Sequence, residues 1–255
     1  ESGWILASHG GYPADSGKVG TLLDSLLGIR VSAPVTTSPT SHSQLQVAAD
    51  THDKRVRIGA GQTVELLVGA GGKDAHVRRA DQDEVHVARG LSPWSLGTTP
   101  SQYHDPIYLS LDADSVASVE LHCSGDESAP LQLERSGDAW ASPALEAEQS
   151  LDADSVDALV GKLASLRIAA LPEDPAVTPQ AVCTVSWVTV EEGASVVGSL
   201  VIGAEEQGRR RVIVEGNPHS VMVSSYGLEP LVTARLEELL ASGDDTGAPM
   251  LLPVP

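Results

Sequence analysis

Asp15-Ser-Gly-Lys-Val-Gly-Thr-Leu-Leu-Asp-Ser-Leu-Leu-Gly-Ile-Arg-Val31 is the stretch that decides the fold, because a related pattern returns at residues 152–168. The later stretch is Asp152-Ala-Asp-Ser-Val-Asp-Ala-Leu-Val-Gly-Lys-Leu-Ala-Ser-Leu-Arg-Ile168. In each stretch four aliphatic residues fall at i, i+3, i+4 and i+7, which gathers them on one face of an α-helix. The two sets are Val19, Leu22, Leu23 and Leu26, and Val156, Leu159, Val160 and Leu163.

Both predicted helices begin after an acidic residue. Asp15 and Asp152 stand just before the periodic runs, where a carboxylate can accept hydrogen bonds from the free N–H groups of the first turn. Each helix gives way to an apolar-Arg-apolar step and then to Pro34 or Pro172, which discourages further helix. A helix of this length is marginal alone, so we expect each one to pack on a sheet.

Period-two alternation predicts strands after each helix. In the first half these strands are residues 45–47, 55–58, 64–68, 75–79 and 84–88, after a Ser-, Thr- and Pro-rich connection at 32–44 that is typical of a linker. Matching segments at 200–204, 211–214 and 221–223 follow in the same order in the second half. A hairpin of residues 116–123 with 131–135 precedes the second helix and has no counterpart ahead of Trp4.

The repeated order predicts an α+β protein of two tandem repeats, each a mainly antiparallel β-sheet carrying one principal α-helix. We expect the first repeat over residues 1–107, without its N-terminal hairpin, and the second over residues 108–242. Residues 243–255 are expected to form a C-terminal tail. A further helix is expected near Leu231 to Leu240, ending at Gly243.

The charge balance limits the classes of partner. Sixteen Lys and Arg residues against thirty-five Asp and Glu residues give a formal net charge of -19, which repels nucleic acid and anionic membrane surfaces. No apolar run reaches the length of a membrane span. The chain begins at Glu1 without a methionine, which is compatible with removal of a targeting or anchoring segment.

Two cysteines in 255 residues do not make a disulfide scaffold. Cys123 shares strand parity with Leu121, and Cys183 with Val185, so we expect both thiols to point into cores. Two buried free thiols are the expected arrangement. One bridge between the two cysteines is the alternative.

A series of motifs resembles a known bacterial family. They are a Trp-x-Leu run at 4–6, a Tyr-Pro-Ala-Asp loop at 12–15, the helix at 19–26, Leu-x-Val-Gly at 66–69 and His-Val-Arg at 76–78. The chain in both halves is similar to domain of unknown function 4340. The resemblance implies an extracytoplasmic protein, in the periplasm or at the outer face of the inner membrane and membrane-anchored in its full-length form. Such proteins occur beside ABC-type exporters and gliding machinery, and no catalytic residues carry over.

Four motifs that suggest chemistry lack parts which that chemistry needs. Gly69-Ala-Gly-Gly-Lys73 lacks the first glycine and the final Ser or Thr of a phosphate loop, and His9-Gly-Gly11 has no nucleophile elbow to serve. The Asp pairs at 112–114 and 152–154 lack the third ligand of a calcium loop, so capping explains them better. The histidines show no zinc spacing. We therefore assign no catalytic, cofactor-binding or metal-binding residues, and we expect no cofactor.

Basic residues gather on two predicted hairpins. Strand alternation is expected to place His76, Arg78 and His86 on the face opposite the valines of the first hairpin. These side chains either pair with nearby Asp and Glu or form a docking surface for an acidic partner or anionic glycan. Docking requires Arg78 and residues 209–211 to be exposed without close carboxylates. The full docking set is His76, Arg78, Arg79, His86, Arg89, Arg209, Arg210, Arg211 and His219.

These observations predict a non-enzymatic, extracytoplasmic interaction module that is auxiliary to a membrane ABC-type transport system. Its expected partner is a protein, such as a transporter component, and not nucleic acid, with membrane contact only through an anchor outside this chain. One alternative is a hydrolase whose site is assembled from residues distant in sequence. Another is a glycan-binding or small-ligand-binding protein, which would ordinarily use exposed aromatic residues, and few are available.

Overall fold

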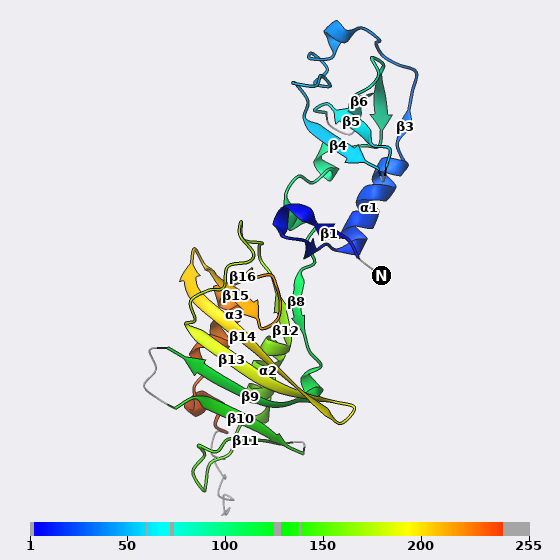
Figure 1. The fold of residues 1–255 in the computed structure, drawn as a ribbon. Coiled ribbons are helices and arrows are strands. Elements are labelled where there is room, and N and C mark those ends of the chain that lie inside the picture. Colours follow the sequence, from blue (N-terminus) through cyan, green and yellow to red (C-terminus); the bar gives the residue numbers. More distant parts are fainter. Residues whose placement is uncertain (1–2, 60, 72–73, 125–128, 138, 242–255) are drawn as a thin grey trace, which may run out of the picture. The chain divides into compact units, whose positions relative to one another are not determined.

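The computed structural model describes residues 3–59, 61–71, 74–124, 129–137 and 139–241. The chain divides into two compact units, one of residues 1–6 and 13–105 and the other of residues 7–12 and 106–255. Within the described residues three α-helices accompany antiparallel sheets (Figure 1). The predicted α+β class is confirmed, with β-structure dominant.

The first unit contains a five-stranded sheet in the order β3-β7-β6-β5-β4. All of its paired strands are antiparallel. The strands follow one helix, as predicted. The elements of the N-terminal part are β1 (Ile5–Leu6), β2 (Tyr12–Pro13), α1 (Ser16–Leu27), β3 (Arg30–Val31), β4 (Lys54–Ile58), β5 (Val64–Val68), β6 (Ala75–Arg79) and β7 (Val85–Arg89).

Helix α1 covers one face of this sheet. The Asp15 carboxylate accepts hydrogen bonds from the N–H groups of Gly17 and Lys18, so the predicted N-cap is confirmed. Leu26 is buried in a cluster with sheet residues such as Val68 and Val77, and Leu22 packs against that cluster. Leu22 and Leu26 of the predicted apolar face therefore meet the sheet, whereas Val19 and Leu23 are only half-buried.

The segment of residues 32–52 covers the opposite face, and it does not act as a linker. Val47 is fully buried against Leu67 and Val85, and Thr36 forms an isolated bridge with Val85. The strand expected at 45–47 does not form. A sheet with aliphatic side chains on both faces needs cover on both, and this irregular segment supplies the second layer.

The second unit is built on a seven-stranded sheet in the order β11-β10-β9-β13-β14-β15-β16. The predicted hairpin of β9 and β10 is confirmed. The elements are β8 (Ile107–Ser110), β9 (Val116–Cys123), β10 (Leu131–Ser136), β11 (Ala139–Ala141), α2 (Ala153–Ala164), β12 (Ser165–Arg167), β13 (Cys183–Glu191), β14 (Ala194–Glu206), β15 (Arg209–Val214), β16 (Val221–Ser224) and α3 (Ser225–Thr233).

Helices α2 and α3 lie together on one face of this sheet (Figure 1). The four aliphatic residues predicted to face the core from α2 are all buried, and Asp152 caps the helix by accepting from the Ser155 N–H. They meet sheet residues such as Val185 and Leu200. The other face of the sheet presents Ser118, Glu120, Ser186 and Ser199, as expected of an antiparallel sheet with one face toward water.

The helix expected near Leu231 to Leu240 is placed differently. Helix α3 begins at Ser225 and ends at Thr233, and a short 3-10 helix follows over Leu236–Leu239. The predicted end at Gly243 lies outside the described residues, as does the predicted tail. Gly227 and Pro230 ordinarily discourage helix, but both stand inside α3.

Trp140 of β11 contacts two polar side chains of the second unit. It is buried, its Nε1 donates to the Asp157 carboxylate at 3.0 Å, and the Arg135 guanidinium lies 4.8 Å from its ring centre. If the two units superpose as tandem repeats, Trp4 is the counterpart of Trp140 and is expected to occupy the equivalent place in the first unit. It is instead 53% exposed, so the two tryptophans differ in their surroundings.

The burial of the α2 face leads to a stability prediction. Leu159→Ala removes a side chain that is 4% exposed, so we expect it to lower the free energy of unfolding by about 2–5 kcal/mol. Lys162→Ala, on the exposed side of the same helix, should change it by less than about 0.5 kcal/mol. Chemical denaturation measures both values, and equal losses would show that the wrong face has been placed inward.

Candidate docking surfaces

The predicted placement of His76, Arg78 and His86 on one face of the β6–β7 hairpin is wrong. Val77 is the partner of His86, and His76 is the partner of Val87. Antiparallel partners share a face of the sheet. His76 and His86 therefore lie on opposite faces, and alternation within each strand could not reveal the offset that the turn imposes.

Arg78 is a structural clamp, although exposure was expected of it. Its side chain is 7% exposed and lies beneath the segment that covers the sheet. Its Nε donates to the Val47 carbonyl at 2.8 Å and its Nη1 to the Gln82 carbonyl at 2.7 Å. A charged side chain can be buried when its donors are satisfied. Arg78 thus joins the segment of residues 32–52 to the β6–β7 turn.

The other basic residues of this hairpin differ in their exposure and in their hydrogen-bond partners. Arg79 donates to the Asp81 carboxylate at 2.8 and 3.0 Å, and this contact holds the pKa of that carboxyl below its ordinary value. The His86 ring lies 2.9 Å from the Ser32 carbonyl through Nδ1. Arg89 is exposed, at the edge of a shallow hollow that Ser32 and other residues also line.

The three arginines of β15 do not form one free patch either. Arg209 is exposed. Arg210 donates to the Gly203 carbonyl at 3.1 Å and lies 3.7 Å from the Glu205 carboxylate. Arg211 donates to the Asp174 carbonyl at 3.0 Å. Arg78, which is buried, and Arg210, which lies near a carboxylate, therefore do not meet the condition that docking requires. Arg211 is half-buried. For Arg209 docking stays a prediction.

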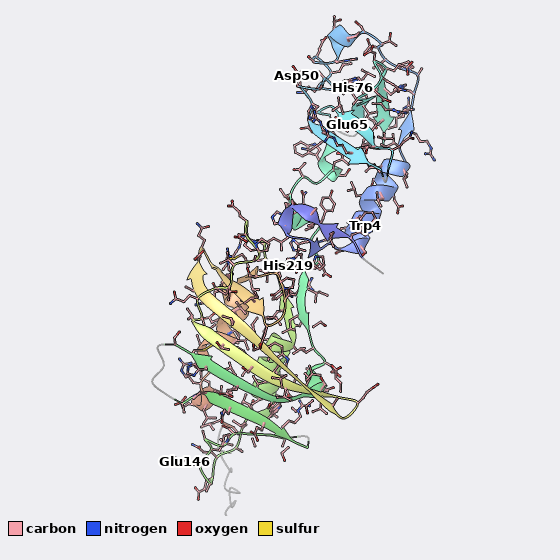
Figure 2. All side chains as sticks on the ribbon, in the orientation of Figure 1. Trp4, Asp50, Glu65, His76, Glu146 and His219 are labelled. Carbon is pink, nitrogen blue, oxygen red and sulfur yellow. A yellow bond between two sulfur atoms is a disulfide. The ribbon has the colours of Figure 1, made fainter. Side chains whose placement is uncertain are left out.

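His219 is a tie within the second unit. Its Nε2 lies 2.9 Å from the Gly10 carbonyl, and its ring meets the Tyr12 ring edge-on at 5.5 Å (His219 is labelled in Figure 2). Its carbonyl accepts a hydrogen bond from the Tyr108 hydroxyl at 2.6 Å. These contacts hold residues 10–12 against the turn before β16, which is a packing role.

A basic strand that the sequence interpretation passed over lies at the edge of the first sheet. β4 reads Lys54-Arg55-Val56-Arg57-Ile58 and pairs only with β5 among the described strands. Glu65 of β5, labelled in Figure 2, receives both arginines: its carboxylate lies 3.3 Å from Arg55 Nε and 2.7 Å from Arg57 Nε. The signal in the sequence was three basic residues within five, but only the sheet order shows that the strand is at an edge.

The two cysteines form a disulfide, so the expectation of free thiols is wrong. Cys123 of β9 is the register partner of Cys183 of β13, and the two sulfur atoms are bonded. Both side chains do lie in the core as expected, Cys183 buried and Cys123 half-buried. The bond joins residues 60 positions apart in the sequence. Strand parity suggested burial, but the pairing of β9 with β13 was needed to predict the bond.

A cavity lies beside the disulfide, at the end of β9 and β10. Its volume is about 220 Å³, and apolar residues such as Leu121, Leu131 and Ala234 line it together with His122 and Gln132. Pockets that bind small organic molecules usually measure about 300 Å³ or more. This cavity is therefore small for such a ligand, and the small-ligand alternative stays a prediction.

The described part of the chain has neither a metal-binding cluster nor a helix that could span a membrane. No group of three or more His, Cys, Asp or Glu side chains there is arranged to hold a metal ion. The paired aspartates act as caps: Asp112 accepts from the Asp114 N–H, just as Asp152 accepts from Ser155. No helix in the same residues has both the length and the apolar character needed to cross a membrane.

The clamp formed by Arg78 can be tested against its neighbour. Arg78→Met leaves buried carbonyls without a donor, so we expect the first unit to lose about 3 kcal/mol of stability. Arg79→Met removes an exposed ion pair and should cost no more than about 1 kcal/mol. Amide hydrogen exchange in residues 64–89 under mild denaturant reports on this unit alone. Similar exchange rates in the two variants would contradict the clamp.

Comparison with known proteins gives one match. The family model described as "Domain of unknown function (DUF4340)" matches residues 4–186, which is well over half of the chain. No curated protein and no solved structure shows significant similarity to it. The extent of the match confirms the resemblance read from the motifs: this chain belongs to the DUF4340 family.

Proposed function

We propose that the chain is a non-enzymatic, extracytoplasmic interaction module that is auxiliary to a membrane ABC-type transport system. The disulfide between Cys123 and Cys183 is the observation that carries the location, because such bonds persist in oxidising compartments and are rare in the cytosol. Membership of the DUF4340 family supports the setting, since resemblance to this family implies neighbours of the ABC-exporter type.

The exposed charges of the described residues support binding to a partner more than they support catalysis. It offers an exposed basic edge strand, β4, and exposed cationic side chains such as Arg89 and Arg209. Exposed charges of this kind chiefly guide association and select partners. We therefore assign binding of a protein partner to the chain and leave both alternatives of the sequence analysis without a supporting observation.

We also propose that the two units are copies of one ancestral domain. In the first, α1 is followed by four consecutive antiparallel strands, β4-β5-β6-β7, and in the second α2 is followed by β13-β14-β15-β16. The segment after each helix returns to the last of these strands: β3 pairs with β7, and Ala170 forms a bridge with Met222 of β16. The same order of helix and strands in both units supports a common origin.

The location can be tested by thiol chemistry in intact cells of the bacterium that carries the natural gene. We expect a maleimide carrying polyethylene glycol to leave the chain unmodified until a reductant opens the disulfide. The control is the variant Cys123→Ser, in which Cys183 should react after unfolding without reduction. Complete labelling of both thiols before reduction would contradict an extracytoplasmic location.

The partner class can be tested in the same cells by photo-crosslinking. A photoreactive residue at Arg89 or Arg209 is expected to join the chain to a subunit of a membrane transporter, identified by mass spectrometry. The same residue at Lys162, on the exposed side of α2, serves as the matched control. Crosslinks that appear equally from all three positions, or that contain no membrane protein, would contradict the auxiliary role.

The disulfide also predicts a stability difference. Replacing both cysteines by serine releases the loop between β9 and β13, and we expect a loss of about 2–4 kcal/mol in the unfolding free energy of the second unit. Denaturation with and without dithiothreitol measures this. The reductant should weaken the natural protein and leave the double variant unchanged. A natural protein that is insensitive to the reductant would contradict the bond's contribution.

A further inference from the structure

β4 is an edge strand of the first sheet, whereas β13, which follows the helix in the same way in the second unit, is an internal strand. β4 hydrogen-bonds to β5 on one side, and no other described strand lies on its other side. In the second unit β13 has the corresponding neighbour, β14, on one side, but β9 pairs along its other side over seven register positions. A strand in the position of β4 is thus able to have partners on both sides.

From this difference we propose that β4 binds an extended acidic segment of a partner protein, which adds as a further strand to the five-stranded sheet. An open edge presents unpaired N–H and C=O groups that can pair with an added strand. The inference rests on the proposed function and deepens it, because it names the chemistry of one docking site.

The charges of β4 select the sign of the partner. Lys54, Arg55 and Arg57 are three of the chain's sixteen basic residues. Within 4 Å of them lie only two carboxylates among the described residues, those of Asp53 and Glu65. The strand therefore keeps a positive surplus, and the Arg57 side chain is 60% exposed.

The alternation of β4 selects the pattern of the partner. Arg55 and Arg57 share the face that carries Glu65, whereas Val56 lies on the α1 face, against the core cluster of the first unit. An added strand would place its residues in the same alternation. Acidic residues would then meet the arginines, and apolar residues between them would extend the core beside Val56. The favoured segment thus alternates acidic and apolar residues.

The distribution of charge along the chain agrees with this choice. Residues 1–105 contain nine Lys and Arg against eleven Asp and Glu, whereas residues 106–255 contain seven against twenty-four. The first unit is therefore close to neutral although the whole chain carries -19. An acidic strand that approaches β4 meets a locally positive edge on a nearly neutral unit.

A second copy of this chain is a poor occupant of the same edge. Antiparallel pairing of two β4 strands about Val56 would place Arg55 of one copy opposite Arg57 of the other. Like charges directly opposite each other destabilise a strand pair. Basic residues on an edge strand commonly serve to prevent such self-association. The same residues that reject another β4 attract an acidic strand.

The test uses the full chain and a fluorescent peptide in which Glu and Val alternate. The charge control is the matched peptide in which Lys replaces every Glu. Fluorescence anisotropy should show binding of the Glu peptide only. Arg57→Glu should weaken that binding about tenfold, since it replaces an attractive cross-strand pair by a repulsive one. Lys162→Glu makes the same change in net charge away from the edge and should leave binding within about twofold of the natural protein.

Amide hydrogen exchange shows where the peptide binds. We expect slower exchange in residues 54–58 with the Glu peptide, and Arg57→Gln provides a milder variant if Arg57→Glu alters folding. Equal binding of both peptides, no binding of either, or equal effects of Arg57→Glu and Lys162→Glu would overturn the proposal. So would a dimer that protects residues 54–58 without peptide. None of these results would affect the location and crosslinking experiments, so the two proposals can fail separately.

Discussion

Both units depend on one constraint: the apolar faces of a β-sheet must be covered, and the backbone groups of its edge strands need hydrogen-bond partners. A face of aliphatic side chains needs a second layer, and an edge leaves backbone donors and acceptors without partners. In the second unit α2 and α3 cover one face, and the other is polar enough to meet water. In the first unit α1 covers one face and an irregular segment covers the other. The differences between the units follow from how each one meets these needs.

Arg78 illustrates how a cover without secondary structure can be fixed. The segment of residues 32–52 has few ladder hydrogen bonds of its own, so its carbonyls need donors from elsewhere. Arg78 supplies one to Val47, and the His42 ring lies 2.9 Å from the Asp83 carbonyl. Arg78, which the sequence analysis assigned to docking, is instead buried and hydrogen-bonded to backbone carbonyls. Charge alone therefore does not mark a docking residue, and its burial must be known first.

The features that could be predicted from the sequence were those set by nearby residues. The apolar face of α2 and the caps at Asp15 and Asp152 depend on spacings within a few turns, and the structure confirms them. The disulfide depends on the pairing of β9 with β13, which is not local. The faces of His76 and His86 depend on the offset of a turn. Alternation within one strand contains no information about either, since both are properties of pairs of strands.

The same reasoning explains why the basic edge strand, and not the basic hairpins, is the better candidate for docking. The β6–β7 hairpin is internal to its sheet, and Arg78 and Arg79 on it donate to carbonyls or a carboxylate. In the second unit β15 is internal as well, and Arg210 and Arg211 donate to carbonyls. β4 also has an arginine paired with a carboxylate, but the Arg57 side chain stays 60% exposed beside Glu65, and the β4 backbone is paired on one side only. Recognition through an edge uses both, because backbone pairing provides affinity and the side chains choose the partner. The position of a charged strand in its sheet is thus more informative than the number of charges it carries.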